Sequence, residues 1–287
     1  MIPHHLFVGA EDAPHLAFVL HGVLGAGHNF RSFAKRLNEA RPDIRFALID
    51  LRYHGRSLGA PPPHTLEACA SDLEDLAEHL GRSPSLVLGH SLGGKVALTY
   101  GRRVTLDEAH PAHAGLSQVW ALDSDPGAQE PSQEHEVLRV LGTLRRHAGP
   151  FSSRGEATEK LLADGLPTGL SNWLVMSLDR IPGTEGLLGW RFDLDAIETL
   201  LGDYFSTDLW PFLEDLGRSA GSTGPRFELL VAEHSDRWSG SMRERAAHLP
   251  EGGRVRVHEL EAAGHWVHVD NPDGLLRILT GHFPAAG

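Results

Sequence analysis

The chain has 287 residues, of which 41% are hydrophobic and 22% are charged, with one cysteine and a formal net charge of -12. This composition is typical of a globular protein and excludes the disordered and fibrous classes, and the excess of acidic residues argues against a nucleic-acid-binding surface. The lone Cys69 excludes an intramolecular disulfide.

The first residues lack the basic and apolar regions of a signal peptide, and no apolar run approaches the length of a membrane span. We therefore expect a cytoplasmic protein with no membrane span. The 19 histidines are scattered, and pairs such as His4 and His5 have no acidic residue at a spacing that would complete a metal site. We expect no bound metal.

The first strand is predicted at residues 16–20, a short apolar run that leads into a glycine-rich loop at residues 21–27. The loop lacks the residues that end a phosphate-binding P-loop, and its glycines do not have the dinucleotide-binding spacing. Such a loop can instead direct the backbone N–H of Val23 toward a developing oxyanion.

The next strand is predicted at residues 44–50, and a charged loop follows at residues 50–57. Thr65 is a suitable N-cap for a helix whose apolar stripe runs from Leu66 to Leu80, and Gly81 is its C-terminal signal. This helix brings the chain to the segment at residues 86–98.

An apolar run at residues 86–88 leads directly into Gly89-His90-Ser91-Leu92-Gly93, and a segment compatible with a helix follows. A Gly-x-Ser-x-Gly sequence between a strand and a helix is typical of a nucleophile elbow, a strained turn that presents the serine hydroxyl. The start of the helix also offers unpaired N–H groups beside the serine. Ser91 is therefore the candidate nucleophile.

A further strand is predicted at residues 118–122, and the loop after it contains Asp123 and Asp125. From about residue 130 to residue 224 the strand–helix alternation stops, and amphipathic segments with large apolar residues such as Trp173 take its place. A helical insertion between two strand units is typical of a lid over a site. We expect residues 1–128 and 225–287 to form an α/β core domain and residues 129–224 a helical lid.

The alternation resumes at residues 227–232, and the last strand is predicted at residues 254–260. A turn after this strand carries His265, and a closing helix begins at Asn271-Pro272. A general base must reach the serine from a loop at the same edge of the sheet, and His265 lies on such a loop.

Five segments in chain order carry a resemblance to a known family. They are His21-Gly22-Val23-Leu24-Gly25, Asp50-Leu51-Arg52-Tyr53-His54-Gly55-Arg56-Ser57, Gly89-His90-Ser91-Leu92-Gly93-Gly94-Lys95, Trp190-Arg191-Phe192 and Gly264-His265-Trp266-Val267-His268. Because of these segments the chain resembles the α/β-hydrolase fold and, within it, the small esterases of the YbfF and ABHD-eleven type. The resemblance implies a mostly parallel, doubly wound sheet with an inserted helical lid.

The resemblance implies that Ser91 is the nucleophile and His265 its general base, with the backbone N–H groups of Val23 and Leu92 as the oxyanion hole. His268 is a competing imidazole in the same turn, and we favour His265 because it follows the glycine as the family pattern requires. We expect the substrate pocket to be lined by Leu24, His90, Trp173 and Trp266.

Two residues are the leading candidates for the acid of the triad, ahead of the neighbouring Asp125 and the more remote Asp195 in the lid. An α/β hydrolase usually places it after the penultimate strand, where this chain has Asp236. The resembled esterases carry a serine in that loop, matching Ser235, and keep an aspartate after the strand that follows the elbow, matching Asp123. Either loop could place a carboxylate on the far nitrogen of His265. We favour Asp123 over Asp236.

The implied reaction is a two-step acyl transfer, in which Ser91 attacks an ester or thioester carbonyl and water activated by His265 releases the acid. We expect a carboxylesterase-like serine hydrolase that acts on a small acyl substrate and needs no cofactor. Carbon–carbon bond hydrolases, lactonases and cofactor-free haloperoxidases share this triad and are alternatives, as is a non-catalytic hydrolase-fold protein that binds a small ligand. The sequence does not set the oligomeric state.

Overall fold

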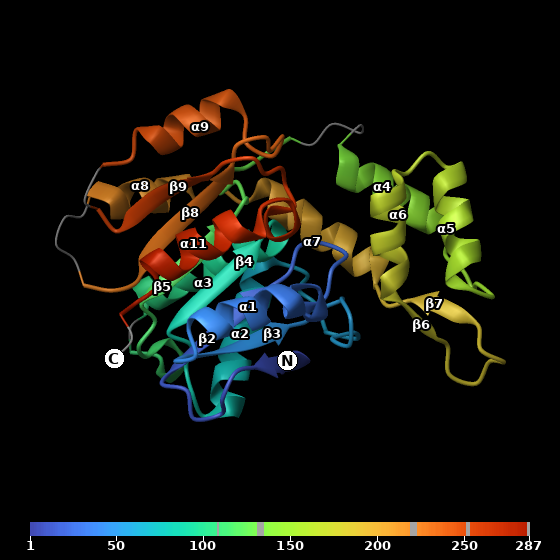
Figure 1. Ribbon diagram of the computed structural model, residues 1–287, viewed down its shortest axis with the longest axis horizontal. Helices are drawn as coiled ribbons and strands as arrows, with labels where there is room; N and C mark the ends of the chain where they lie inside the picture. The colour runs from blue at the N-terminus through green and yellow to red at the C-terminus, as the bar shows by residue number, and fades with distance from the viewer. Residues whose placement is uncertain (108, 131–134, 219–222, 251–252, 286–287) are drawn as a thin grey trace.

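A seven-stranded sheet with the order β1-β3-β2-β4-β5-β8-β9 forms the centre of the computed structural model (Figure 1). The structure describes residues 1–285 except 108, 131–134, 219–222 and 251–252. Strand β1 runs antiparallel to β3, and the other neighbours in the sheet are parallel. The strands are β1 (His5–Val8), β2 (His15–Leu20), β3 (Ile44–Ile49), β4 (Leu86–His90), β5 (Gln118–Leu122), β8 (Arg226–Ala232) and β9 (Val255–Leu260).

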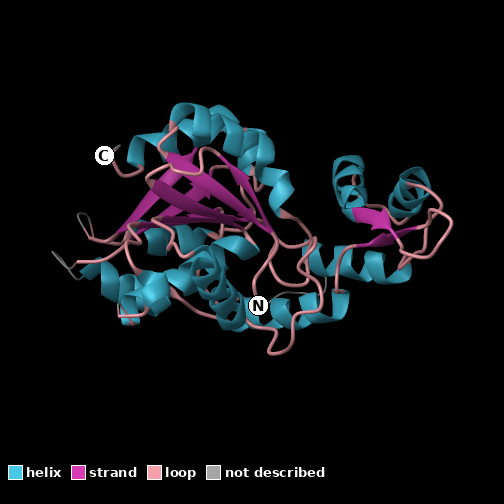
Figure 2. Cartoon of the chain, turned by 90° about the horizontal axis from the view of Figure 1, so that it is seen from below, coloured by secondary structure: helices cyan, strands magenta, loops and turns pink. Residues whose placement is uncertain are grey.

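Helices cover both faces of the sheet (Figure 2). They are α1 (Arg31–Ala40), α2 (Leu66–Leu80), α3 (Leu92–Leu106), α9 (Gly240–Ala247), α10 (Val267–Asp270) and α11 (Pro272–His282), with single 3-10 turns η1 (Gly27–Phe30) and η2 (Pro111–His113).

Successive side chains of a strand point to opposite faces of the sheet, so each strand contributes to two apolar clusters. Phe18 and Leu20 of β2 belong to one cluster together with residues of α2 and α3. Ala17 and Val19 belong to a second cluster with residues of α1 and α11. The expected mostly parallel, doubly wound sheet is confirmed.

The chain forms an insertion between β5 and β8. It consists of α4 (Glu136–Arg146), α5 (Arg154–Ala163), α6 (Thr168–Leu174), η3 (Val175–Ser177), β6 (Leu178–Arg180), β7 (Leu188–Trp190), α7 (Leu194–Ser206) and α8 (Trp210–Arg218). Figures 1 and 2 show α4, α5, α6 and the antiparallel pair β6–β7 beyond one end of the sheet. Helix α8 instead contacts β9.

The sequence predicted helices in this insertion but not the β6–β7 pair. Each of these strands has three residues, which is too short for a recognisable alternation of polar and apolar side chains. Residues 131–134, near the start of the predicted helical lid, lie outside the described part of the chain.

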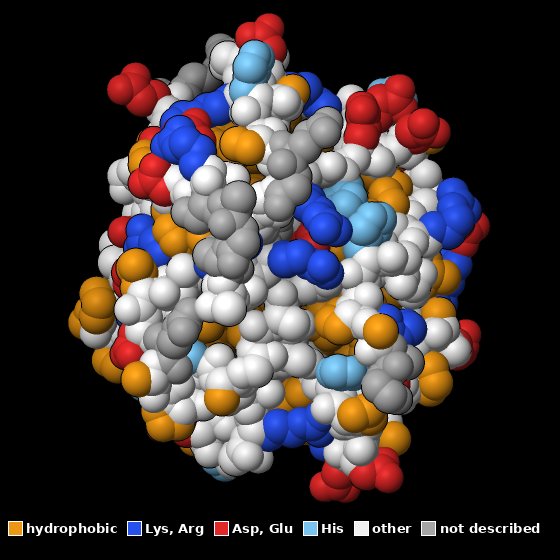
Figure 3. All heavy atoms as spheres, turned by 90° about the vertical axis from the view of Figure 1, so that its left-hand side faces the viewer, with side chains coloured by type: hydrophobic (Ala, Val, Ile, Leu, Met, Phe, Trp, Pro, Cys, Tyr) orange, Lys and Arg blue, Asp and Glu red, His pale blue; other side chains and the backbone are white. Residues whose placement is uncertain are grey.

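None of the helices in the described ranges is both long and apolar enough to cross a bilayer. On the face seen in Figure 3, Lys and Arg side chains occur in several separate groups with acidic and uncharged side chains between them. That face therefore presents no continuous basic field of the kind that a nucleic-acid backbone requires.

Candidate active site

Ser91 lies on a strained turn between β4 and α3. Its φ is 54° and its ψ is -119°, a conformation that non-glycine residues rarely adopt. The neighbouring glycines permit the turn, because a β-carbon on Gly89 would overlap the carbonyl oxygen of Gly93. The Ser91 N–H donates a hydrogen bond to the Leu122 carbonyl oxygen at 3.1 Å, which attaches the turn to β5.

The glycine-rich loop after β2 lies in contact with this turn. A β-carbon on Gly22 would be 3.3 Å from the β-carbon of Ser91. The next residues, Val23 and Leu24, line the same pocket as Ser91, and Leu24 has a φ of 60°. Leu92 is the first residue of α3, where backbone N–H groups have no partner within the helix.

A buried histidine fixes this loop. The Leu51 N–H donates to His21 Nε2 at 3.0 Å, so the ring proton is on Nδ1, which donates to the Gly22 carbonyl oxygen at 2.7 Å. Burial lowers the pKa of His21, which keeps the ring neutral and this tautomer in place. His21 thus links the loop to the end of β3, as does Asp50, whose Oδ1 accepts a hydrogen bond from the Gly27 N–H at 2.7 Å.

His265 forms a hydrogen bond with the carboxylate of Asp123. The distance between Nδ1 and Oδ2 is 2.7 Å, and the Asp123 side chain is fully buried. The same oxygen accepts a hydrogen bond from the Ser235 hydroxyl at 2.6 Å, and Oδ1 accepts one from the Ala232 N–H at 3.1 Å. These donors, from the end of β8 and the loop after it, hold the carboxylate toward His265.

The other carboxylates weighed from the sequence face elsewhere. The Asp236 side chain is 77% exposed, and its Oδ1 lies 3.2 Å from Nε of Arg237. Asp125 accepts hydrogen bonds from the Gly127 N–H at 2.8 Å and from the Gln129 amide at 2.6 Å. The pairing with His265 therefore distinguishes Asp123 from its neighbours in both loops.

Two further histidines surround His265. His90 Nε2 donates to the His265 carbonyl oxygen at 2.7 Å, and burial lowers the pKa of His90 well below its ordinary value. His268 stacks on Phe30 with 4.2 Å between ring centroids, and burial lowers its pKa to about 4. Both rings are therefore neutral near pH 7, and His90 ties the His265 turn to the end of β4.

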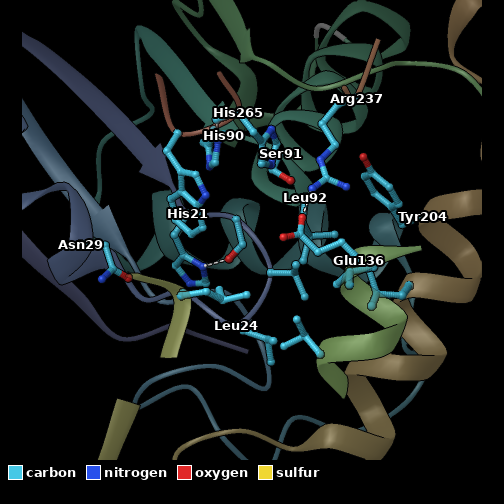
Figure 4. A pocket seen from close by; sticks show the side chains of 18 of the residues that line it. His21, Leu24, Asn29, His90, Ser91, Leu92, Glu136, Tyr204, Arg237 and His265 are labelled. Carbon is cyan, nitrogen blue, oxygen red and sulfur yellow. Dashed lines mark hydrogen bonds and ion pairs between the residues drawn. The ribbon is translucent and has the colours of Figure 1, made fainter. Parts of the chain in front are cut away.

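A single pocket brings these residues together (Figure 4). Trp173 of α6 and Trp266 both line it and contact each other edge to face, with 4.8 Å between ring centroids. The residues expected from the sequence that line it are Ser91, His265, Val23, Leu92, Leu24, His90, Trp173 and Trp266, whereas Asp123 lies behind His265 and Asp236 does not line it.

Sequence reasoning missed two charged residues of the pocket wall, Arg237 and Glu136, which form an ion pair. Arg237 follows Ser235 and Asp236 in the loop after β8, a position at the carboxyl end of a strand that could have been noticed. No comparable feature of the sequence marks Glu136 as a residue of the pocket. Within the described residues, no group of three or more His, Cys, Asp or Glu side chains could hold a metal ion.

A mostly parallel sheet with a serine on the strained turn after its central strand, and a His–Asp pair at the same edge, defines the class of α/β-hydrolase folds. The model of the alpha/beta hydrolase family matches residues 17–278, and the chain belongs to this family. The recognition of this fold from the sequence is confirmed.

Several known proteins are similar to the chain. The sn-1-specific diacylglycerol lipase ABHD11 of Danio rerio is 39% identical over 287 residues, which cover 97% of this chain and 81% of that protein. Lipase LipV of Mycobacterium tuberculosis is 33% identical over 199 residues, 69% of each chain. A solved structure titled marine microorganism esterase has a TM-score of 0.74 at 22% identity, covers 96% of this chain and 98% of its own, and shows the shared fold. The family membership and the similarity to these lipases and this esterase identify the chain as a carboxylesterase-like hydrolase.

Proposed function

We propose that the protein is a serine hydrolase that cleaves carboxylic ester or thioester bonds of small acyl substrates. The observation that carries this proposal is the 2.7 Å hydrogen bond from His265 Nδ1 to the buried Asp123 carboxylate, because Ser91 and His265 line the same pocket. The two lipases that are similar to this chain support the same reaction class.

In the proposed mechanism, Asp123 keeps the proton of His265 on Nδ1, so that Nε2 accepts the proton of the Ser91 hydroxyl. The serine oxygen attacks the carbonyl carbon, and the backbone N–H groups of Val23 and Leu92 stabilise the negative charge on the carbonyl oxygen. The bond from the carbonyl carbon to the leaving oxygen or sulfur then breaks, and His265 gives its proton to that atom, so that an alcohol or thiol departs. Water, deprotonated by His265, attacks the acyl-enzyme and releases the acid.

We also propose that the insertion, residues 129–224, is a lid over this pocket. Residues from three of its helices line the pocket, among them Val137 of α4, Trp173 of α6 and Leu201 of α7. The apolar wall that they form suits an acyl chain. The names of the two lipases similar to this chain favour lipid esters as a second substrate class. Rates on nitrophenyl esters of graded acyl length, on acyl-CoA thioesters and on a diacylglycerol would rank these classes.

Labelling with a fluorophosphonate tests whether Ser91 is a nucleophile. We expect the wild-type protein to be labelled at Ser91 and the Ser91→Ala variant to remain unlabelled, because only an activated serine reacts at a useful rate. A wild-type protein that is not labelled, and whose substrate binding persists, would instead support the alternative of a non-catalytic ligand-binding protein.

Paired substitutions test the acid. Asp123→Asn should lower kcat on a neutral nitrophenyl ester by about 10³- to 10⁴-fold, because the amide cannot hold the correct tautomer of His265 or stabilise its charged form. Asp236→Asn should change kcat by less than about tenfold, since its carboxylate faces solvent. The reverse ranking would refute the assignment of Asp123.

A further inference from the structure

The positively charged side chain of Arg237 lines the pocket that contains Ser91 (Figure 4). The Arg237 N–H donates to the Ser235 hydroxyl oxygen at 3.1 Å, and the Ser235 hydroxyl donates to Asp123 at 2.6 Å. The backbone that carries the guanidinium is therefore fixed to the same carboxylate that binds His265. The hydrogen bonds through Ser235 and Asp123 therefore fix the backbone of Arg237 relative to His265.

The present partners of Arg237 are two exposed carboxylates. Glu136, at the start of α4, forms an ion pair with a terminal nitrogen of Arg237. The Glu136 side chain is 54% exposed and the Arg237 side chain is 21% exposed. An oxygen of Asp236 lies 3.2 Å from Nε, but this buried Nε donates no hydrogen bond within the described part of the chain. Ion pairs with solvent-exposed carboxylates contribute little free energy, so Glu136 can be exchanged for another carboxylate.

Three other titratable groups of the pocket wall, His135, His90 and Tyr204, are neutral near pH 7. Burial, reinforced by the charge of Arg237, lowers the pKa of His135, and burial also lowers that of His90. Burial raises the pKa of Tyr204, so its hydroxyl stays protonated. The field of Arg237 thus reaches three groups of the pocket wall, and its positive charge is balanced there by Glu136.

A guanidinium on an otherwise largely apolar wall suits one kind of ligand. It presents parallel N–H donors that match the two oxygens of a carboxylate, and the pairing gains strength where water is excluded. Glu136 already places a carboxylate on Arg237, in the same pocket that Ser91 and Leu92 line (Figure 4).

We propose that Arg237 is a subsite for a carboxylate of the substrate and that Glu136 is an internal carboxylate which the substrate displaces. This inference rests on the proposed ester or thioester hydrolase function. The preferred substrates are then esters or thioesters that carry a second, ionised carboxyl group, such as monoesters of dicarboxylic acids.

The test compares pairs of substrates that differ in one charge. Mono-nitrophenyl glutarate and its terminal amide, nitrophenyl glutaramate, place the charge on the acyl side. The acetyl esters of 4-hydroxybenzoate and 4-hydroxybenzamide place it on the leaving group. The measured quantity is the ratio of kcat/KM for the anionic member to kcat/KM for the amide, so that any general effect on catalysis cancels.

Three variants give the expected pattern. Arg237→Gln should lower the ratio by about 10- to 100-fold for one of the two substrate pairs, the range expected for a hydrogen-bonded charge. Glu136→Gln should raise the same ratio severalfold, because the competing carboxylate is gone. Arg145→Gln is the matched control: Arg145 pairs with Asp195 at 2.7 Å on the outside of the insertion, and its loss should leave the ratio unchanged.

Binding to the Ser91→Ala variant separates this inference from the proposed function. Calorimetry with mono-nitrophenyl glutarate, and with the amide as reference, measures recognition of the carboxylate without turnover. Ester hydrolysis with ratios that Arg237→Gln does not alter would overturn the subsite alone. If no ester is hydrolysed, Arg237-dependent binding of the anion would sustain the subsite, while equal binding of acid and amide would overturn both.

Discussion

The glycines beside Ser91 leave no space for a side chain. A β-carbon on Gly93 would lie 2.6 Å from the carbonyl oxygen of His21 and 2.7 Å from that of Leu20, so the backbone at the end of β2 would have to move. We expect Gly93→Ala to lower the free energy of unfolding by about 2–3 kcal/mol, the upper end of the usual cost of overpacking. Urea denaturation of the wild type and of Gly93→Ala measures this difference in the free energy of unfolding.

Gly202 of α7 is the matched control, because a β-carbon there would meet nothing within 4 Å. Gly202→Ala should raise the free energy of unfolding by about 0.5–1 kcal/mol, since alanine restricts the unfolded chain and favours the helix. If both substitutions change stability in the same direction, the steric explanation for the elbow glycines is wrong.

The candidate site was predictable to the extent that local sequence encodes it. The strained serine turn has a five-residue pattern, and the His265 turn follows a strand, so both could be placed at one sheet edge. The choice between Asp123 and Asp236 could not be derived from the pattern, because both follow strands that end at that edge. It depends on where the Ser235 hydroxyl and Ala232 N–H direct their hydrogen bonds, which is a property of tertiary structure.

Lys95 connects helix α3 to the residues just before the insertion and to the C-terminal end of α7. Its ammonium is buried and donates to the carbonyl oxygens of Gly127 and Tyr204 at 2.7 Å and of Thr207 at 3.0 Å. Tyr204 and Thr207 lie at the C-terminal end of α7, where carbonyl groups lack partners within the helix. Lys95→Met would leave these carbonyls unsatisfied, and we expect it to lower the free energy of unfolding by about 1–3 kcal/mol.

The loss of stability caused by Lys95→Met should depend on pH. Burial lowers the pKa of Lys95 from 10.5 to about 8, although Asp125 opposes the shift. Between these values the unfolded chain binds more protons than the folded chain, so the stability of the wild type relative to Lys95→Met should rise as pH increases. Denaturation of both proteins at several pH values between 8 and 10.5 measures this.

Lys160→Met is the control, because it removes an exposed partner of Glu156. It should cause neither the loss of stability nor its dependence on pH. A pH-independent difference between the wild type and Lys95→Met would contradict the lowered pKa of Lys95.

Elements differ in how fully their own residues specify them. Helix α2 was predicted with its bounds, because the Thr65 hydroxyl accepts a hydrogen bond from the Ala68 N–H and Gly81 ends the helix with a φ of 61°. Strand β1 has four residues and no apolar face of its own that the sequence would reveal. Its conformation depends on pairing with β3, a contact between distant parts of the chain.

Across the whole molecule, the order of elements was the most predictable property, since strands and helices alternate until residue 130 and again after residue 225. How closely the insertion joins the sheet was not predictable. One apolar cluster contains Val96 of α3 and Leu200 of α7 together with Leu161 of α5. Packing of this kind depends on the combined shape of several elements and leaves no periodic signal in any one of them.

Four histidines at or next to the pocket make the stability of the whole molecule sensitive to acid. Burial lowers the pKa of His21 and His90, that of His54 to about 3 and that of His268 to about 4. In the unfolded chain these groups titrate near 6.5, so below that pH the unfolded chain binds more protons. The free energy of unfolding should therefore fall as pH decreases from 6.5 to 5, by up to about 1.4 kcal/mol per pH unit for each histidine.

His54 offers a direct check of this slope. Its Nδ1 bonds the Arg52 carbonyl oxygen at 2.8 Å, and its buried Nε2 has no hydrogen-bond partner in the described ranges. The amide of His54→Asn can replace the Nδ1 donor without a titratable group, so the slope of stability between pH 5 and 6.5 should decrease by up to about 1.4 kcal/mol per pH unit. The same substitution at His234, whose side chain is 66% exposed, should leave the slope unchanged. Equal slopes for wild type and His54→Asn would mean that His54 is not held neutral by burial.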